Sequence, residues 1–372
     1  MNLLGGKQHT MSILHSLAES TLPHTLTILA TYQCTAACKQ CCFESSPDVQ
    51  GRLSREQILN RITEAKQSFA GLKLVVFSGG EAFLLKDDLY AAIELATSFG
   101  LMTRVVTNAS WGKNTEHAFK TAERLKQAGI TEINISTGAD HQEWVPVASI
   151  VNAAFALTKT GIPTLITVES ETKESDCTGE ITRHPMIREA LLTEILQIQS
   201  NSWMPFSEDA GQRKNFLSEH LLESGCNQIF ETIVVTPHSN LSACCGLTLE
   251  HIPEMRLGHI SDNFSMRDLF LSQSDDFLKY WIHVDGPYSI IKRLLGGRSE
   301  DILKNVVHIC QACVVLHQNP LVREALAARY SEFVPEIMTR FSLEASMQRR
   351  EQEFISSART FATTIEINEI SI

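Results

Sequence analysis

Short apolar runs of β-type composition alternate with segments of helical periodicity over roughly the first 200 residues, in a repeat of about 30 residues. The runs are mostly apolar and do not alternate strictly, which is typical of strands covered on both faces. The pattern therefore predicts βαβ units and a parallel sheet. The six expected strands are Thr25–Ala30, Leu72–Phe77, Met102–Thr107, Glu132–Ser136, Thr164–Val168 and Ile195–Gln199.

The segments between these strands carry helix start and stop signals. Ser54 precedes an apolar stripe and has a capping-box partner at Gln57, and Gly129 stands where helices often end on glycine. Six such units predict an α/β fold, a partial TIM-type (β/α)6 barrel, in which ligands bind at the carboxyl ends of the strands. Further helices are expected at about Asp87–Phe99, Thr115–Ala128 and Pro146–Thr160.

The rhythm breaks after about Ser200, where the cysteines become widely spaced and only Phe230–Thr236 resembles a strand. We expect an N-terminal extension at 1–23, the barrel at 24–200, a smaller C-terminal α+β domain at 201–330, and a helix and tail at 331–372. The closing TTIEINEISI predicts a strand or a tail.

Composition and charge narrow the function classes. The net charge is −11 and no run is rich in Lys or Arg, which argues against nucleic acid or a membrane surface as a partner. No stretch approaches the roughly 18 apolar residues of a membrane span, and the start lacks the pattern of a signal peptide. We therefore expect a cytoplasmic protein, in which ten cysteines indicate metal sites or redox chemistry.

The first cysteines follow the first expected strand with the spacing C-x3-C-x2-C, as Cys34, Cys38 and Cys41. Three thiolates so close together can hold three irons of a [4Fe–4S] cluster and leave the fourth iron open. A zinc site is the alternative, for which the local sequence offers only Cys42 as the fourth ligand.

This spacing, followed one strand later by Gly79-Gly80-Glu81, resembles the radical S-adenosylmethionine (SAM) superfamily over roughly residues 24–200. The resemblance implies that the GGE segment meets the amino group of SAM. At Gly138 many relatives carry an acid that contacts the ribose, so Asp140 or His141 are candidates to replace it. The further residues that the resemblance assigns to SAM are Thr107 and Asn108 near the ribose, Ser136 at the end of the fourth strand, and Thr167 in the strand end Thr167–Ser170, which is expected to line the adenine pocket.

A second set of cysteines lies downstream. The segment from Val235 to Cys244 resembles the hairpin of SPASM and twitch domains, and Leu257–Ile260 followed by Met266–Leu271 resembles the stretch that comes next in those domains. The resemblance implies one auxiliary [4Fe–4S] cluster, although a four-cysteine zinc ribbon would use the same residues, and Cys245 could replace Cys244. The expected ligands are Cys226, Cys244, Cys310 and Cys313.

The resemblance implies an enzyme that reductively cleaves SAM to a 5′-deoxyadenosyl radical, which abstracts a substrate hydrogen. Its electron donor would be of the flavodoxin or ferredoxin type, and its substrate a peptide or a small molecule. We expect oxidative modification of a ribosomally made peptide. The alternatives are a dehydrogenase, an epimerase in which Cys177 returns a hydrogen atom, and a non-catalytic zinc or electron-carrier protein.

Overall fold

The computed structural model describes residues 14–19, 22–169, 176–201, 204, 206, 219–261 and 263–369. Most of the expected N-terminal extension at 1–23 therefore lies outside the described residues. None of the helices in the described part of the chain has both the length and the apolar character needed to cross a bilayer.

A single nine-stranded sheet organises the molecule, with the strand order β6-β5-β4-β3-β2-β1-β7-β8-β9. Strands β1 to β6 are parallel and adjacent in sequence order, as expected for βαβ units. The strands are β1 (Thr25–Leu29), β2 (Leu74–Ser78), β3 (Met102–Thr107), β4 (Glu132–Thr137), β5 (Thr164–Glu169), β6 (Leu196–Asn201), β7 (Thr232–Val235), β8 (Asn240–Ser242) and β9 (Arg256–His259).

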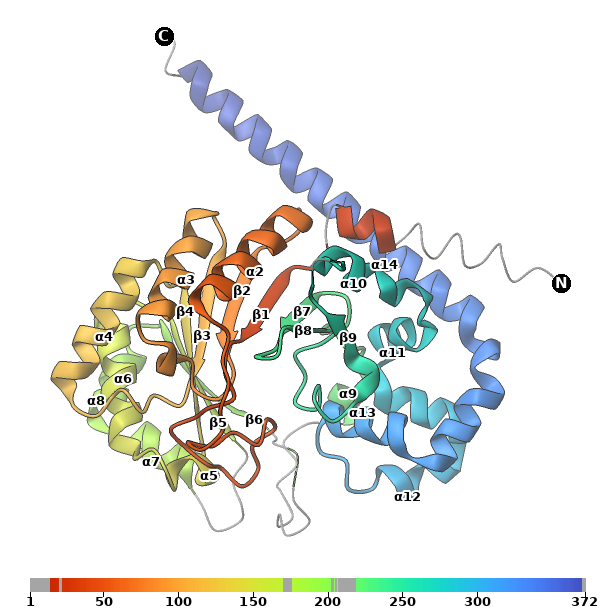
Figure 1. Ribbon diagram of the computed structural model, residues 1–372, viewed down its shortest axis with the longest axis horizontal. Helices are drawn as coiled ribbons and strands as arrows, with labels where there is room; N and C mark the ends of the chain where they lie inside the picture. Colours follow the sequence, from red (N-terminus) through yellow and green to blue (C-terminus); the bar gives the residue numbers. More distant parts are fainter. Residues whose placement is uncertain are drawn as a thin grey trace.

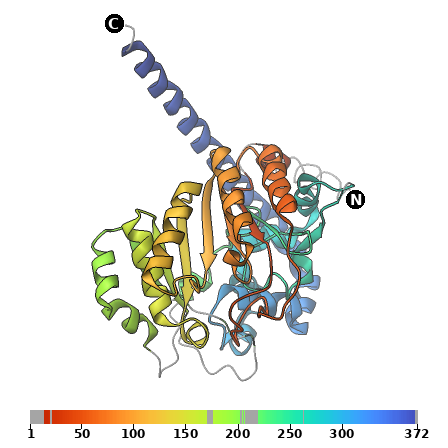
Figure 2. The same cartoon turned by 60° about the vertical axis from the view of Figure 1, so that its left-hand side comes forward.

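Helices between the first six strands cover the outer face of this part of the sheet (Figures 1 and 2). Ser54 and Gln57 form the expected capping box, in which each side chain binds the other residue's backbone N–H. The predicted partial (β/α)6 barrel is thus confirmed. The helices are α2 (Arg55–Ser68), α3 (Asp87–Ser98), α4 (Thr115–Ala128), α5 (Ala139–Gln142), α6 (Val147–Lys159), α7 (Cys177–Arg183) and α8 (Pro185–Leu191).

The C-terminal part continues the same sheet, because β7 pairs in parallel with β1, and β8 and β9 follow antiparallel. The expected hairpin between β7 and β8 turns at Ser239, whose φ of +58° lies in the left-handed region. The expected helix Met266–Leu271 is confirmed as α10.

Mostly helical structure surrounds this extension (Figure 1). The helices are α9 (Glu219–Leu222), α10, α11 (Phe277–Leu295), α12 (Ser299–Leu303), α13 (Ile309–Gln318) and α14 (Pro320–Glu369), and short 3₁₀ turns lie at Ala82–Leu85, Pro253–Met255, Ser272–Asp275 and Gly296–Arg298.

Helix α14 differs from the expected C-terminal segment. It is continuous from Pro320 to Glu369 and its last part projects from the body of the molecule (Figure 1). The expected strand at the C-terminus is therefore wrong as far as Glu369, since the β-branched residues there continue a helix that started in packed structure. Buried Asp285 of α11 binds Arg340 of α14 and Arg293 of its own helix, which ties the two helices together.

Candidate functional site

A cavity of about 330 Å³ opens at the carboxyl ends of β1 to β6. Its wall combines the loop that follows β1 with polar side chains from the ends of the next strands. Nine of the ten residues expected to hold the first cluster or SAM line it, namely Cys34, Cys38, Cys41, Gly79, Gly80, Thr107, Asn108, Ser136 and Thr167, and so does His141, a candidate to replace the acid missing at Gly138.

The cysteine loop is held by its own backbone. The N–H of Cys34 binds the carbonyl of Ser46 at 3.0 Å, and the N–H of Ser45 binds the sulfur of Cys41 at 3.4 Å. Gln40 accepts a hydrogen bond from the N–H of Phe206 at 2.6 Å. The Phe43 ring stacks on Tyr32 at 5.5 Å between centroids.

Gly79 and Gly80 press the end of β2 against the start of this loop. Two backbone hydrogen bonds cross this contact. The Gly80 N–H donates to the Thr31 carbonyl at 2.8 Å, and the Glu81 N–H donates to the Gln33 carbonyl at 2.9 Å. A Cβ atom would lie 2.3 Å from the Thr31 oxygen at position 79, and 2.1 Å from the Gln33 oxygen at position 80. Both glycines are therefore required for the close approach of two backbone segments.

Glu81 is fully buried, and its carboxylate faces β3. Oε1 accepts hydrogen bonds from the Phe83 N–H at 3.0 Å and the Thr107 hydroxyl at 2.8 Å, and Oε2 accepts one from the Asn108 N–H at 2.9 Å. Burial raises the pKa of this carboxyl, and the three donors oppose that effect. Glu81 is absent from the described lining of the cavity, so the contact with the amino group of SAM stays a prediction.

Glu169 lies in the strand end Thr167–Ser170 that was expected near the adenine, but sequence reasoning assigned no role to its carboxylate. It ends β5, is 2% exposed, and lines the cavity. Its carboxylate accepts the Asp140 N–H at 2.8 Å and pairs with His141 at 3.4 Å. A Cβ atom on Gly138 would lie 1.8 Å from the Glu169 Cγ, so this side chain occupies the space beside the position where relatives carry an acid. The missing side chain at Gly138 is the one feature of the sequence that leaves room for this placement.

Burial controls the chemistry of the cavity thiols. It raises the pKa of Cys34 to about 11, and that of Cys38 well above its usual value, where the negative charge of Glu169 adds to the effect. Both thiols are therefore protonated at neutral pH until a cation takes the place of the proton.

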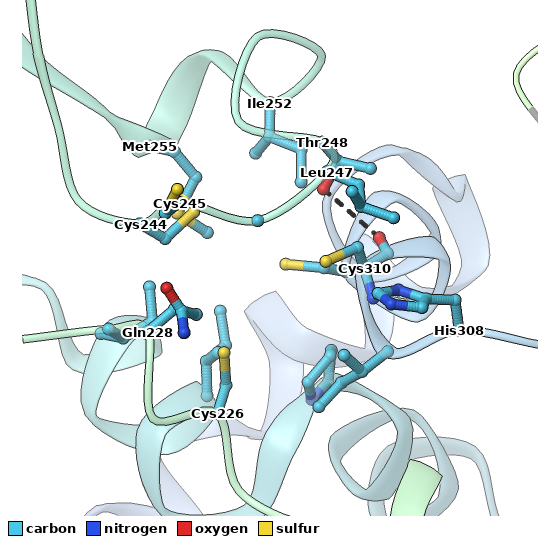
Figure 3. A pocket seen from close by; sticks show the side chains of 16 residues that line it. Cys226, Gln228, Cys244, Cys245, Leu247, Thr248, Ile252, Met255, His308 and Cys310 are labelled. Carbon is cyan, nitrogen blue, oxygen red and sulfur yellow. Dashed lines mark hydrogen bonds between the residues drawn. The ribbon is translucent and has the colours of Figure 1, made fainter. Parts of the chain in front are cut away.

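A second cavity of about 310 Å³ lies between the loop that follows β8 and the helices α11 and α13. Cys226, Cys244 and Cys310 face it from three separate segments (Figure 3), and Cys313 also lines it. Within the described part of the chain, no three His, Cys, Asp or Glu side chains are gathered tightly enough to hold a single metal ion. The four cysteines surround a larger space instead.

The thiols of the second cavity are shifted in the same direction. Burial, with a smaller contribution from the neighbouring thiols, raises the pKa of Cys310 to about 12 and that of Cys313 well above its usual value. Gly246 lies against this group, because a Cβ there would be 3.0 Å from the Cys310 sulfur.

The segment Cys245–Leu247 lines both cavities and therefore forms the wall between them. Burial raises the pKa of Cys244, and the nearby thiols of Cys310 and Cys226 raise it as well, whereas a hydrogen bond from the Gly246 N–H opposes this effect. The Cys245 thiol is instead hydrogen-bonded to the hydroxyl of Thr27 in β1. Both thiols line the second cavity, so the assignment of Cys244 as the ligand stays a prediction.

Cys177 does not reach either cavity in the part of the chain that the structure describes. It begins α7, is 4% exposed, and belongs to the apolar core. Two other thiols outside the expected ligand set, Cys42 and Cys245, do line the first cavity. Their placement depends on the loop after β1 meeting the hairpin after β7, which spacing along the chain does not reveal.

Comparison with known proteins adds a sequence match and a fold match. A profile of the Radical SAM superfamily matches residues 28–165. The "Putative peptide biosynthesis protein YydG" of Bacillus subtilis (strain 168) is 27% identical over 128 residues, which are 34% of this chain and 40% of that protein. The chain thus matches less than half the length of this relative.

The solved structure "Native anSMEcpe with bound AdoMet and Cp18Cys peptide" superposes with a TM-score of 0.54 at 14% identity, over 85% of this chain and 98% of that one. "Native anSMEcpe with bound AdoMet" gives a TM-score of 0.52 at 13% identity, over 85% and 99%. Because the sequence identities are 14% and 13%, these two superpositions show a shared fold alone.

Proposed function

Since the chain carries a radical SAM domain, we propose that it cleaves SAM reductively in the first cavity and modifies a peptide by abstracting one of its hydrogen atoms. One observation carries the proposal: three thiols with C-x3-C-x2-C spacing line the same cavity as the two glycines of the GGE segment and the ends of β3, β4 and β5. A [4Fe–4S] cluster with SAM on its open iron would supply the 5′-deoxyadenosyl radical.

The residues present suit these two groups. Cys34, Cys38 and Cys41 are soft sulfur donors on a loop whose backbone is tied at several points. For SAM, Glu169 supplies the carboxylate that Gly138 lacks, anchored by the Asp140 N–H and by His141. A buried carboxylate can accept both hydroxyls of a ribose, and a charged acceptor makes the stronger hydrogen bonds.

We propose an auxiliary [4Fe–4S] cluster in the second cavity, held by Cys226, Cys244, Cys310 and Cys313. Zinc binds four thiolates at about 2.3 Å and fills the space between them. A cavity of about 310 Å³ is larger than such a site needs and suits a cluster. With all four irons held by protein, this cluster would serve as a carrier of electrons.

The name of the YydG relative supports a peptide as the substrate. The test is anaerobic reconstitution with iron and sulfide, followed by dithionite and SAM, with peptides encoded beside the gene as candidate substrates. About eight irons per chain and formation of 5′-deoxyadenosine are expected. Bound zinc without SAM cleavage would refute the proposal. Deuterium transfer from a labelled peptide into 5′-deoxyadenosine identifies the substrate.

The fate of the substrate radical has two candidate outcomes. Oxidation, the outcome expected from the sequence, removes one more electron and a proton, and the second cavity supports it because an auxiliary cluster there would accept the electron. The product would then be lighter than the peptide by two hydrogens.

A redox-neutral outcome is favoured by the thiols Cys42 and Cys245 in the first cavity. Cys245 would give its S–H hydrogen atom to the carbon radical, which forms a C–H bond and leaves a sulfur radical. One electron from a flavodoxin- or ferredoxin-type donor and one proton would restore the thiol.

The two outcomes separate in D₂O, because a thiol hydrogen exchanges with solvent. Hydrogen return predicts one deuterium in a product of otherwise unchanged mass, and Cys245→Ala should stop product formation while 5′-deoxyadenosine still forms. Cys177→Ala is the matched control, since Cys177 is buried away from the described cavity lining. Product made at the normal rate by Cys245→Ala would exclude this role.

A further inference from the structure

We propose that Asn108 is a positioning residue that donates an N–H···S hydrogen bond to Cys34 and thereby raises the reduction potential of the cluster in the first cavity. The inference rests on the proposed function only in that Cys34, Cys38 and Cys41 hold this cluster. It assigns Asn108 a different role from the ribose contact that the family resemblance implies.

The geometry of the Asn108 amide carries the proposal. Its Nδ2 lies 3.5 Å from the Cys34 sulfur and 3.0 Å from the Thr35 hydroxyl oxygen, so both amide hydrogens have acceptors. Its Oδ1 accepts the Ser110 N–H at 3.0 Å. Because only an oxygen can accept from that N–H, the nitrogen end of the amide must face the sulfur.

The backbone of Asn108 is held just as firmly. Its N–H donates to Glu81 Oε2 at 2.9 Å, and Glu81 Oε1 binds the neighbouring Thr107 hydroxyl at 2.8 Å. The next residue, Ala109, has a φ of +58°, a conformation that a residue with a Cβ adopts only where its surroundings enforce it. The GGE acid thus fixes the end of β3, and β3 presents the amide to the cysteine loop.

The electrostatic consequence follows from burial. Asn108 is 6% exposed and Cys34 is 9% exposed, so water competes little for the contact. Reduction adds negative charge to a cluster and its thiolates, and a hydrogen bond to a ligand sulfur stabilises that charge. Glu169, which lies near Cys38, acts in the opposite direction, so Asn108 offsets a carboxylate in the same cavity.

The test is a redox titration, followed by electron paramagnetic resonance, of the reconstituted full chain with Cys244→Ser and Cys310→Ser, so that only the first cluster contributes. Asn108→Asp keeps the oxygen that accepts the Ser110 N–H, removes the donor, and adds a negative charge. Its one-electron reduction equilibrium should fall about tenfold, which is a shift of about 59 mV to lower potential. Asn108→Ala should shift less in the same direction.

Asn134→Ala is the matched control, since Asn134 also lines the cavity but binds Thr167 at 3.0 Å and no cysteine. Its potential should equal that of the parent. A second readout uses the parent itself: an exchangeable proton coupled to the reduced cluster should disappear in Asn108→Ala and persist in Asn134→Ala.

An unchanged potential and proton coupling in both Asn108 variants would overturn the proposal, and weaker SAM binding with that result would assign Asn108 to the ribose. If Asn108→Ala fails to take up a cluster, the potential of Asn108→Asp and the proton coupling of the parent still test the hydrogen bond. If the proposed function itself were wrong, the parent protein would hold no [4Fe–4S] cluster in the first cavity, which distinguishes that outcome from an unchanged potential.

Discussion

The two cysteine-lined cavities have similar volumes but are built in opposite ways. The first takes its three expected ligands from one loop of eight residues, Cys34 to Cys41, and its other lining groups from successive strand ends. The second takes its four from three segments that are distant in sequence, and its remaining lining is largely apolar. The first has strand-end polar groups for a bound molecule, whereas the second offers mainly sulfur ligands.

The two cavities also share a wall. Cys245, Gly246 and Leu247 line both, so a few residues separate the proposed radical site from the proposed electron carrier. Replacing a cysteine in one cavity therefore tests whether each cavity takes up its cluster independently of the other.

The largest effect is expected from Cys38→Ala. Losing one of three thiolates should remove the first cluster and reduce 5′-deoxyadenosine formation to background, while about four irons remain in the second cavity. Iron analysis and product chromatography measure both. Cys42→Ala is the control, because Cys42 lines the cavity outside the C-x3-C-x2-C set. Equal loss in both variants would contradict the ligand assignment.

Next in size is the mirror experiment in the second cavity. Cys244→Ala should leave about four irons per chain, and dithionite-driven SAM cleavage should continue because the first cavity is intact. Cys245→Ala should keep about eight irons, since that thiol bonds Thr27. The opposite pattern of iron loss would exchange the roles of the two cysteines.

A smaller effect is expected from Gly80→Ala. The added methyl group would meet the Gln33 carbonyl at 2.1 Å, so two backbone segments must separate, at a cost of about 1–3 kcal/mol in the free energy of unfolding. Denaturant titration of the apo chain measures it. Gly297→Ala, which has open space around the new Cβ, should remain within about 0.5 kcal/mol of the parent. Equal destabilisation would remove the packing explanation.

The smallest effect concerns SAM affinity. Glu169→Gln keeps the shape of the side chain but removes the charge, and about tenfold weaker binding of SAM is expected, since a hydrogen bond to a charged group contributes about 1.5–3 kcal/mol. Calorimetric titration of the loaded protein gives the Kd. Glu143→Gln is the control, because Glu143 is exposed and makes only a loose surface ion pair with Lys39, at 4.0 Å. Unchanged affinity in Glu169→Gln would mean that another group replaces the acid missing at Gly138.

Local signals in the sequence were sufficient for much of the barrel. The predicted bounds of β3 and α4 agree with the structure, and the Ser54 capping box is present. These features depend on side-chain periodicity and on hydrogen bonds within a few residues, which a sequence displays directly. The cysteine spacing and the GGE turn likewise indicated one shared cavity.

Other features had no local signal. That β7 would pair beside β1 depends on which sheet edge is free, and helix α14 continues through β-branched residues because of the structure that precedes them. Glu81 is not among the described residues that line the cavity, because three donors, two of them from Thr107 and Asn108 in the cavity wall, converge on its buried carboxylate.

The sequence by itself thus determined the α/β rhythm, the barrel and the first set of thiols, because short-range patterns encode them. Only the tertiary structure decided that Glu169 fills the space beside Gly138, that Asn108 faces Cys34, and that Cys245 shares a wall between two cavities. Each of those contacts joins residues far apart in sequence, so its existence depends on how whole elements pack.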